Sequence, residues 1–579
     1  MRGFGPGLRP PLCLRSVQRR SSSSCSVRRL TNVYVRAMFG ICQVCGRRPA
    51  GKGRRRAGVP SEPSSAAPRA ASSGRAQLSR DSRAVKVPRV KPLPLFAGLA
   101  LFALPLAVET ELSHWGEHGA RPALTAALAL LMATWWITEA LPIAWTACVP
   151  LFVLPFATIY GAGFGANLLG AVGPYFDPYI FLFLGGMGIA AAMQQWHLHR
   201  RIALQVMRVV GTDARRLLLG LLVATAAVSL WISNTATAAM MFPIGLALIG
   251  EFEAESGRRL SGYGAALMLA VAYGASVGGI GTKIGTVPST LLAGFLAQRG
   301  VEVSFLEFAA IGVPFVFLFL PIVWLALWRV GRTDAPAAEV GQRALAGEGA
   351  RIGGMRRAEK VVLAVFLATA AVWVMGKPLT DALRARALPD LATAHVEAGI
   401  AMLASLVLFA WRAEGRRVLE PASLRFVQWE TLVLLGGGFS LAAAIQASGL
   451  SHWLGAQLAA LRAAPAFAQV VAASVATVAL SAFASNAATT AVMLPILAGS
   501  VAPEHATAIL FAATFSASCD FALPAGTPPN AIVFGSGYLT IPLMARTGVV
   551  LDLVAALCAA TWCWIAVPVL LSSAAGGGP

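Results

Sequence analysis

Charged side chains are scarce in this sequence. Asp, Glu, Lys and Arg make up only 13% of its 579 residues, whereas hydrophobic residues make up 57% and the mean hydropathy is +0.68. An ordinary soluble domain carries about 25% charged residues. The shortage of charge therefore excludes a soluble enzyme of this length and indicates a protein that crosses a membrane several times.

Residue patterns that carry catalysis or bind metals are also missing. The Cys42-x-x-Cys45 pair has no second pair nearby, and a structural zinc ion needs about four ligands. No Ser/His/Asp arrangement or pair of carboxylates stands at a plausible catalytic position. No loop after residue 91 is longer than about 35 residues, which is too short for a soluble catalytic domain. We therefore expect neither an enzyme nor a cofactor.

The positive charge of the chain is confined to its beginning. Residues 1–91 hold 21 Lys and Arg residues against two acidic ones, whereas residues 92–579 are nearly neutral, so the net charge of +21 does not indicate a nucleic-acid partner. We expect no folded domain in this basic extension. Three interpretations stay open: a disordered cytoplasmic tail on anionic lipid, an organelle transit peptide, or translated upstream sequence.

Apolar segments of membrane-spanning length follow the extension. They occupy 92–108, 122–137, 141–160, 178–195, 305–328, 360–376, 393–411, 430–447 and 546–572. Four more apolar stretches are interrupted near the middle by small or polar residues, at 216–250, 263–298, 468–500 and 505–540. Non-helical backbone at membrane depth is tolerated where it lines a cavity. The pattern predicts an all-α polytopic membrane protein with about 11 transmembrane helices and two re-entrant hairpins.

The distribution of basic residues predicts the orientation. With the N-terminus inside and the stretches 216–250 and 468–500 treated as hairpins, the outside segments carry few Lys and Arg residues. These are Arg121, Arg299, Lys377, Arg384, Arg386 and Arg462. The inside segments carry most of the rest, as the positive-inside rule requires. This topology leaves the C-terminus outside.

Two halves of the membrane region repeat each other. Residues 233–244 resemble residues 485–496 at an offset of 252, and the Gly285-Thr286 motif recurs as Gly526-Thr527 at an offset of 241. Each half therefore has a span, a hairpin and a broken span in the same order. Because the predicted hairpins open from opposite sides, the halves form an inverted repeat, as in many secondary transporters.

The repeated Ser-Asn turns offer polar groups inside the membrane. A helix that begins at such a turn directs backbone N–H groups and a positive dipole end toward the cavity, which suits a carboxylate or another oxyanion. The carbonyl groups that end the preceding half-helix suit a hard cation such as Na⁺. Two facing sites of this kind predict a pocket for a doubly charged anion.

At these turns the sequence resembles the divalent anion:sodium symporter family, the dicarboxylate, tricarboxylate and sulfate carriers. The resemblance covers about residues 92–572 and is most specific at the two Ser-Asn motifs and at 527–535. Residues 135–142 and 198–201 also resemble the family. It implies a homodimer of elevator type, in which a transport domain slides against a scaffold. The corresponding division is 1–91 extension, 92–177 scaffold, 178–300 first transport repeat, 301–428 linker and scaffold, 429–545 second transport repeat, and 546–579 last transmembrane helix and tail.

The resemblance also implies roles for individual residues. One sodium site would use Ser229, Ser233, Asn234 and the backbone at Gly285. The other would use Ser481, Ala484, Asn486 and the backbone at Gly526. The substrate carboxylates would meet Asn234, Thr235, Ser485, Asn486, Thr527 and Pro528.

Two ionisable residues depart from the family pattern, namely Lys283, two residues before Gly285, and Asp520, six residues before Gly526. Such residues at membrane depth usually have a partner or a function. Three interpretations of Lys283 are open: it pairs with Asp520, it replaces a sodium ion beside the first site, or it reaches a water-filled vestibule.

The expected function is sodium-coupled transport of small divalent organic anions, with C4-dicarboxylates such as succinate and malate preferred. Open alternatives are a sodium-independent exchanger with Lys283 as a tethered cation, a sulfate or citrate carrier, and a passive anion channel. The expected partners are the anion, sodium ions, the lipid bilayer and a second copy of the chain. The expected location is the cell inner membrane with a cytoplasmic N-terminus, or an organelle envelope.

Overall fold

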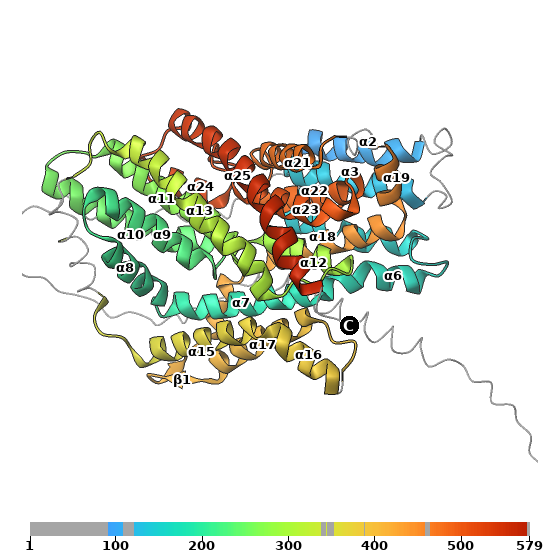
Figure 1. Cartoon of the computed structure of the whole chain (residues 1–579), viewed down its shortest axis with the longest axis horizontal. Coiled ribbons are helices and arrows are strands. Elements are labelled where there is room, and N and C mark those ends of the chain that lie inside the picture. Colours follow the sequence, from blue (N-terminus) through green and yellow to red (C-terminus); the bar gives the residue numbers. More distant parts are fainter. Residues whose placement is uncertain are drawn as a thin grey trace, which may run out of the picture. The chain divides into compact units, whose positions relative to one another are not determined.

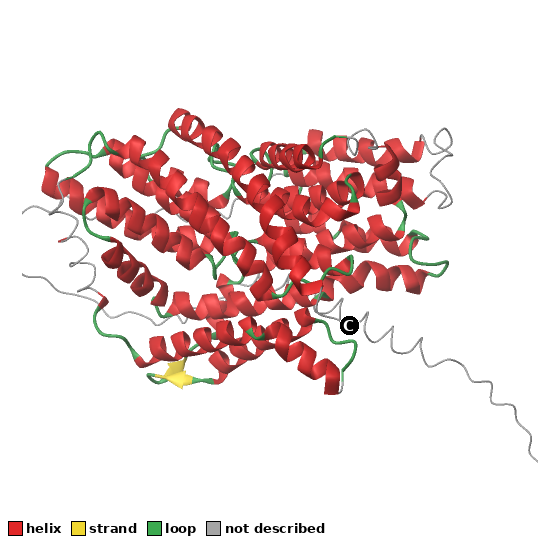
Figure 2. Cartoon of the chain, viewed as in Figure 1, coloured by secondary structure: helices red, strands yellow, loops and turns green. Residues whose placement is uncertain are grey.

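The computed structural model describes residues 91–107, 121–336, 343, 352–386, 388–457 and 464–575. This part of the chain is helical almost throughout (Figure 2), and two short strands, β1 (Arg412–Ala413) and β2 (Arg416–Arg417), pair antiparallel within it. The prediction of an all-α polytopic membrane protein is confirmed. The predicted basic extension, apart from Lys91, lies outside the described residues.

The first half of the described chain is a succession of helices (Figure 1). They are α2 (Pro92–Ala107), α3 (Arg121–Thr138), α4 (Ile143–Ala147), α5 (Val149–Val153), the 3₁₀ helix η2 (Leu154–Phe156), α6 (Phe164–Val172), the 3₁₀ helix η3 (Gly173–Phe176), α7 (Pro178–Gln195), α8 (Leu198–Val210), α9 (Ala214–Ser229), α10 (Asn234–Ser256), α11 (Ser261–Gly279), α12 (Val287–Gln298) and α13 (Phe305–Gly331).

The second half contains a similar succession. It consists of α15 (Arg357–Val374), α16 (Gly376–Arg386), α17 (Thr393–Ala410), the strands β1 and β2, the 3₁₀ helix η4 (Pro421–Phe426), α18 (Trp429–Ala447), α19 (Leu450–Gln457), α21 (Ala466–Ser481), α22 (Asn486–Ser500), α23 (Pro503–Ser518), α24 (Pro528–Phe534) and α25 (Ile541–Ala575).

Six stretches of the described chain are long and apolar enough to cross a membrane. They cover residues 164–195, 234–256, 305–331, 393–410, 429–447 and 541–571. A seventh candidate joins α15 and α16, which meet at a bend of 63°. The predicted number of about 11 crossings stays a prediction, because the remaining crossings would have to be assembled from shorter or broken helices.

The four interrupted stretches are each broken where the sequence predicts. The Ser-Asn turns separate α9 from α10 and α21 from α22, and the Gly-Thr motifs lie in the breaks between α11 and α12 and between α23 and α24. The halves then pack crosswise, because α10 contacts α24 and α12 contacts α22. Helices that begin at a break in one half therefore pack against helices that begin at a break in the other half.

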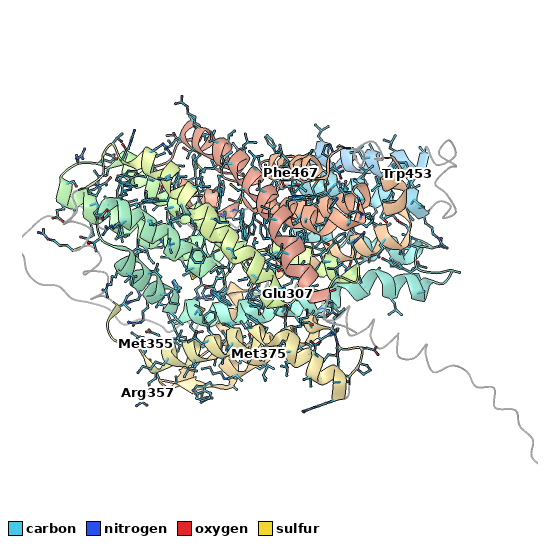
Figure 3. The ribbon with its side chains drawn as sticks, in the orientation of Figure 1. Glu307, Met355, Arg357, Met375, Trp453 and Phe467 are labelled. Atoms are coloured by element: carbon cyan, nitrogen blue, oxygen red, sulfur yellow. The ribbon has the colours of Figure 1, made fainter. Side chains whose placement is uncertain are left out.

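A layer formed by α15, α16 and α17 packs against α7 (Figure 1). The start of α13 is tied to this layer by Glu307, which is labelled in Figure 3. Its side chain completes a capping box with Ser304. The Glu307 carboxylate also accepts a hydrogen bond from Lys377 Nζ of α16 at 2.7 Å. This bond anchors the N-terminus of α13 to α16.

A buried ion pair joins the break between α11 and α12 to α17. Lys283 Nζ donates to Glu397 Oε2 at 2.8 Å, and both side chains are 0% exposed. The other carboxylate oxygen of Glu397 accepts a hydrogen bond from the backbone N–H of Phe305 at 2.6 Å. The ammonium group also lies 5.3 Å from the centre of the Tyr179 ring on α7. Both charges are therefore partnered within the protein.

Two interpretations of Lys283 are wrong. The residue does not pair with Asp520, because its partner is Glu397, and it does not reach a water-filled vestibule, because it is fully buried. The sequence reasoning missed Glu397 because it lies 114 residues away in the chain and belongs to no local motif. Glu397 also neutralises the ammonium charge, which leaves no surplus positive charge to replace a sodium ion.

The ion pair predicts an asymmetric response to mutation. Glu397→Gln leaves a buried ammonium group without a counter-charge, and breaking such a pair costs about 3–5 kcal/mol. We expect this variant to unfold at a clearly lower temperature in detergent, whereas the double variant Lys283→Met/Glu397→Leu should recover much of the loss. Thermal unfolding followed by size-exclusion chromatography measures both. A single variant as stable as the unsubstituted protein contradicts this role of the pair.

Candidate functional site

The first Ser-Asn turn forms a cage of oxygen atoms with the helix that follows it. Ser229 Oγ lies 3.1 Å from Asn234 Oδ1 and 2.6 Å from the carbonyl oxygen of Ala275 in α11. The same end of the Asn234 amide lies 3.0 Å from the Ala275 oxygen and 3.2 Å from the carbonyl oxygen of Gly285. One side-chain amide, one hydroxyl and two carbonyls thus converge on a small volume.

The hydrogen-bond pattern places the nitrogen of the Asn234 amide inside this cage, where it donates to the carbonyl oxygens of Ala275 and Gly285 and to Ser229 Oγ. Rotation of the amide to receive a cation would turn its oxygen inward. Four oxygen atoms would then face one another, and the single hydroxyl proton of Ser229 could serve only one of them. Oxygen atoms gathered in this way are suitable ligands for a hard cation such as Na⁺.

Glycine allows the close approach of backbone in this cage. A Cβ atom on Gly285 would lie 2.5 Å from the Gly279 carbonyl oxygen and 2.8 Å from that of Ser229. A Cβ atom on Gly279 would lie 2.0 Å from Asn234 Oδ1. Any larger residue at either position would therefore push the oxygen atoms apart.

The second Ser-Asn turn builds a matching cage. Ser481 Oγ lies 3.1 Å from Asn486 Oδ1 and 2.8 Å from the carbonyl oxygen of Ala517 in α23. The serine precedes the asparagine by five residues in both halves, and the carbonyl comes from the next helix in both. A single hydroxyl proton again faces two acceptors, so this cage too has oxygen atoms for a cation.

Four helices begin at the edges of these cages, each after a hydroxyl-bearing N-cap residue. The N-caps are Ser233 for α10, Thr286 for α12, Ser485 for α22 and Thr527 for α24. The hydroxyls of Ser485 and Thr527 accept hydrogen bonds from their own helices, whereas those of Ser233 and Thr286 make no such cap. Helix N-termini attract anions through their free N–H groups and dipoles.

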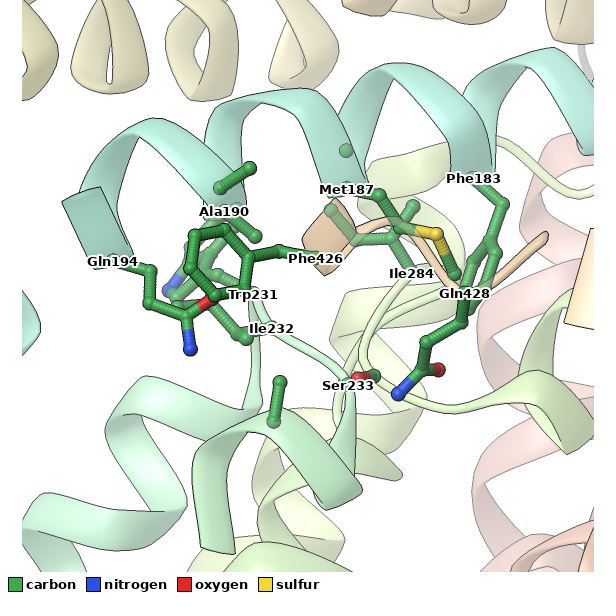
Figure 4. Close-up of a pocket in the computed structure, with 13 residues that line it drawn as sticks. Phe183, Met187, Ala190, Gln194, Trp231, Ile232, Ser233, Ile284, Phe426 and Gln428 are labelled. Carbon is green, nitrogen blue, oxygen red and sulfur yellow. The ribbon is translucent and has the colours of Figure 1, made fainter. Parts of the chain in front are cut away.

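A pocket opens beside the first Ser-Asn turn (Figure 4). Ser233 lies in its wall, together with side chains from α7, from the turn itself and from the break after α11. The figure labels Phe183, Met187, Ala190, Gln194, Trp231, Ile232, Ile284, Phe426 and Gln428 around it. Ser233 is predicted as a sodium-site residue, and none of the predicted substrate residues of either half lines this pocket. The pocket therefore gives access to one turn only.

The structure brings part of each predicted sodium site together. Ser229, Asn234 and Gly285 meet in the first cage, and Ser481 and Asn486 meet in the second. The other predicted residues stand in the breaks or first helical turns: Ser233, Thr235, Ala484, Ser485, Thr527 and Pro528. Gly526 packs against the carboxyl group of Asp520. Binding of sodium or substrate at these residues stays a prediction.

Sequence reasoning missed the backbone carbonyls of Ala275 and Ala517. A carbonyl group is present at every residue, so no residue type signals its use as a ligand. The signal that could have found them is the Ala-Ser dipeptide that both halves share, Ala275-Ser276 and Ala517-Ser518. It stands shortly before each break.

Comparisons with solved structures identify the fold. The chain resembles the Alcanivorax borkumensis YdaH transporter with a TM-score of 0.50 and 16% identity, covering 76% of this chain and 98% of that one. It resembles Neisseria gonorrhoeae MtrF with a TM-score of 0.50 and 14% identity, covering 75% and 96%. At such low identity these likenesses concern the fold alone.

Comparisons with known sequences identify the family. The chain is 38% identical over 439 residues to the sodium-dependent dicarboxylate transporter SdcS of Staphylococcus saprophyticus, covering 73% of this chain and 82% of the relative. It is 35% identical over 458 residues to SdcS of Staphylococcus aureus, covering 77% and 86%. The family described as the sodium:sulfate symporter transmembrane region matches residues 95–570. The chain therefore belongs to this family of membrane transporters and is not an enzyme.

Proposed function

We propose that this chain carries small divalent organic anions, above all C4-dicarboxylates such as succinate and malate, across a membrane together with sodium. The observation that carries the proposal is the duplicated cage, with a serine, an asparagine and a backbone carbonyl in the same arrangement in both halves. The relatives named above, which are called sodium-dependent dicarboxylate transporters, support the same cargo.

The two kinds of site have complementary charge. The N-terminal ends of α10, α12 and α22 are positive ends of helix dipoles and suit the carboxylates of the anion. The helix α24 begins with Pro528 and Pro529, which have no N–H group to donate. The oxygen cages suit the cations that neutralise the anion. Without cations, partial positive charges alone would hold a doubly charged anion, so anion affinity should rise with sodium concentration.

Transport in this proposal follows an elevator mechanism. The anion and the sodium ions bind between the Ser-Asn turns, and the loaded transport repeats then move against the scaffold helices. The crosswise packing of α10 with α24 and of α12 with α22 supports movement of the two repeats as one body. The proposal includes a homodimer in the cell inner membrane. The distribution of basic residues favours a cytoplasmic N-terminus.

Sodium-independent exchange has less support. That alternative needs the positive charge of Lys283 as a substitute for sodium, whereas Glu397 already neutralises this charge at 2.8 Å. We therefore favour sodium-coupled symport over exchange.

Uptake of radiolabelled succinate into proteoliposomes tests the proposal. We expect uptake with an inward sodium gradient and none when sodium is replaced by potassium or choline, because the cages must be filled before the anion binds tightly. Protein-free liposomes provide the background. Sodium-independent uptake that requires only internal succinate contradicts symport.

Asn234→Ala and Asn486→Ala should each reduce sodium-driven succinate uptake by more than about tenfold. Each change removes a side chain that contributes to a cage, and a lost polar interaction of about 1.5–3 kcal/mol corresponds to this factor or more. Gln205→Ala is a matched control, because it removes an exposed amide on α8. The amount of protein inserted is measured in parallel. Normal uptake by both asparagine variants contradicts the assignment of the site.

Ser229→Ala and Ser481→Ala should separate cation binding from anion binding. Each removes one cage hydroxyl, so the apparent sodium affinity should fall by about tenfold. The KM for succinate at saturating sodium should change little, because Ser229 and Ser481 end α9 and α21 and do not belong to the helix N-termini that would bind the anion. Sodium titrations of uptake, together with succinate titrations at high sodium, provide both values. A large increase in KM with unchanged sodium affinity would assign the hydroxyls to the anion instead.

A further inference from the structure

The break between α23 and α24 holds a buried carboxylate that no other group neutralises. The Asp520 side chain is 0% exposed, and neither of its carboxylate oxygens makes a hydrogen bond within the described part of the chain. The backbone N–H of Ala522 is directed toward it without normal hydrogen-bond geometry. No basic side chain of the described residues lies within ion-pair distance of it.

The carboxylate of Asp520 lies beside the backbone of Gly526, which is one member of the predicted second sodium site. A Cβ atom on Gly526 would come within 1.9 Å of Asp520 Oδ2, so the backbone at Gly526 packs directly against the carboxyl group. Gly526 corresponds to Gly285, whose carbonyl oxygen belongs to the first cage. The carboxylate therefore lies next to Gly526, and the counterpart of this glycine in the first half, Gly285, completes the first cage.

The first half has no side chain at the equivalent position. Counted from the Gly-Thr motifs, Asp520 corresponds to Gly279, and counted from the Ala-Ser dipeptides it corresponds to Gly278. A Cβ atom on Gly279 would point into the first cage, 2.0 Å from Asn234 Oδ1. A carboxylate in the corresponding place of the second half adds a negative charge that the first cage lacks.

The surroundings of Asp520 are acidic or neutral. Asp552 of α25 accepts a hydrogen bond from the backbone N–H of Phe521 at 2.8 Å, which brings a second carboxylate close to the first. Tyr273 of α11 donates to the carbonyl oxygen of Phe521 at 3.0 Å, and Cys519 precedes Asp520 in the chain. None of these groups supplies positive charge, and an unpaired carboxylate at membrane depth is costly.

We propose that the Asp520 carboxylate binds a sodium ion of its own beside the second cage, in addition to the cations that the two cages hold, and that this ion travels with the anion. The bound ion would neutralise the buried carboxylate. The inference rests on the proposed function for its cargo, but the binding of the cation is independent of that cargo.

The bound cation changes the charge balance of transport. A dicarboxylate needs two positive charges to cross as a neutral complex, and Asp520 requires one more. The loaded carrier therefore binds one cation more than the anion alone would need. The buried Lys283–Glu397 pair leaves this balance unchanged, because its two charges cancel.

Cation binding to the purified, detergent-solubilised protein tests the site directly. Binding of radiolabelled sodium is measured for the unsubstituted chain, for Asp520→Asn and for Asp520→Gly, which introduces the residue type found in the first half. Asp381→Asn, which removes an exposed carboxylate on α16, is the matched control. We expect both Asp520 variants to bind one sodium ion fewer than the unsubstituted chain and the control variant. Equal sodium binding by the unsubstituted chain and both Asp520 variants overturns the proposal.

If neither Asp520 variant folds, the reversal potential of succinate transport still tests the proposal, because it needs no variant. Measured on the unsubstituted chain, it gives the number of cations per succinate, and the proposal requires one more than the two that neutralise the anion. A value of two overturns it. Asp520-dependent sodium binding without succinate transport would disprove the proposed function alone, whereas sodium-driven succinate uptake that is insensitive to Asp520 substitution would disprove this inference alone.

Discussion

Backbone that leaves the helical conformation inside a membrane must find partners for its N–H and C=O groups within the protein. Four breaks in this chain meet that constraint, and each does so by turning polar atoms toward a neighbouring helix. The serine hydroxyls before the two Ser-Asn turns contact the carbonyls of Ala275 and Ala517, and the asparagine amides contact the same serines. The arrangement that makes the breaks tolerable also gathers the oxygen atoms that a cation needs.

Buried charge is distributed unequally between the two halves. The first half contains an ammonium group that is fully paired with Glu397, so the pair contributes geometry and no net charge. The second half contains Asp520, which has no such partner among the described residues. A carrier that couples an anion to cations depends on the charge of its own binding region, because the loaded complex has to cross a medium of low dielectric constant. This difference in buried charge between the two halves therefore concerns the coupling of the anion to cations rather than the fold.

Much of this architecture could be predicted from the sequence, because the constraint acts on residue types. Helical breaks in a membrane require small and polar residues, so the Ser-Asn and Gly-Thr motifs fixed the positions of all four breaks. Two features could not be predicted. The backbone carbonyls of Ala275 and Ala517, which accept from the two serines, are marked by no residue type and only by the repeated Ala-Ser dipeptide. The pairing of Lys283 with Glu397 joins segments that no local spacing relates. The erroneous pairing with Asp520 came from considering the repeats without the helix that packs beside them.

In the proposed function, the two Ser-Asn cages hold cations that neutralise the bound anion. The most direct measurement is a cryo-electron microscopy structure of the protein in lipid nanodiscs, determined once with sodium and succinate and once with potassium alone. The account predicts sodium-dependent density enclosed by Ser229, Asn234 and Gly285, equivalent density at Ser481 and Asn486, and an elongated feature between the helix N-termini. Succinate density elsewhere, with both cages unchanged between the two conditions, would contradict it.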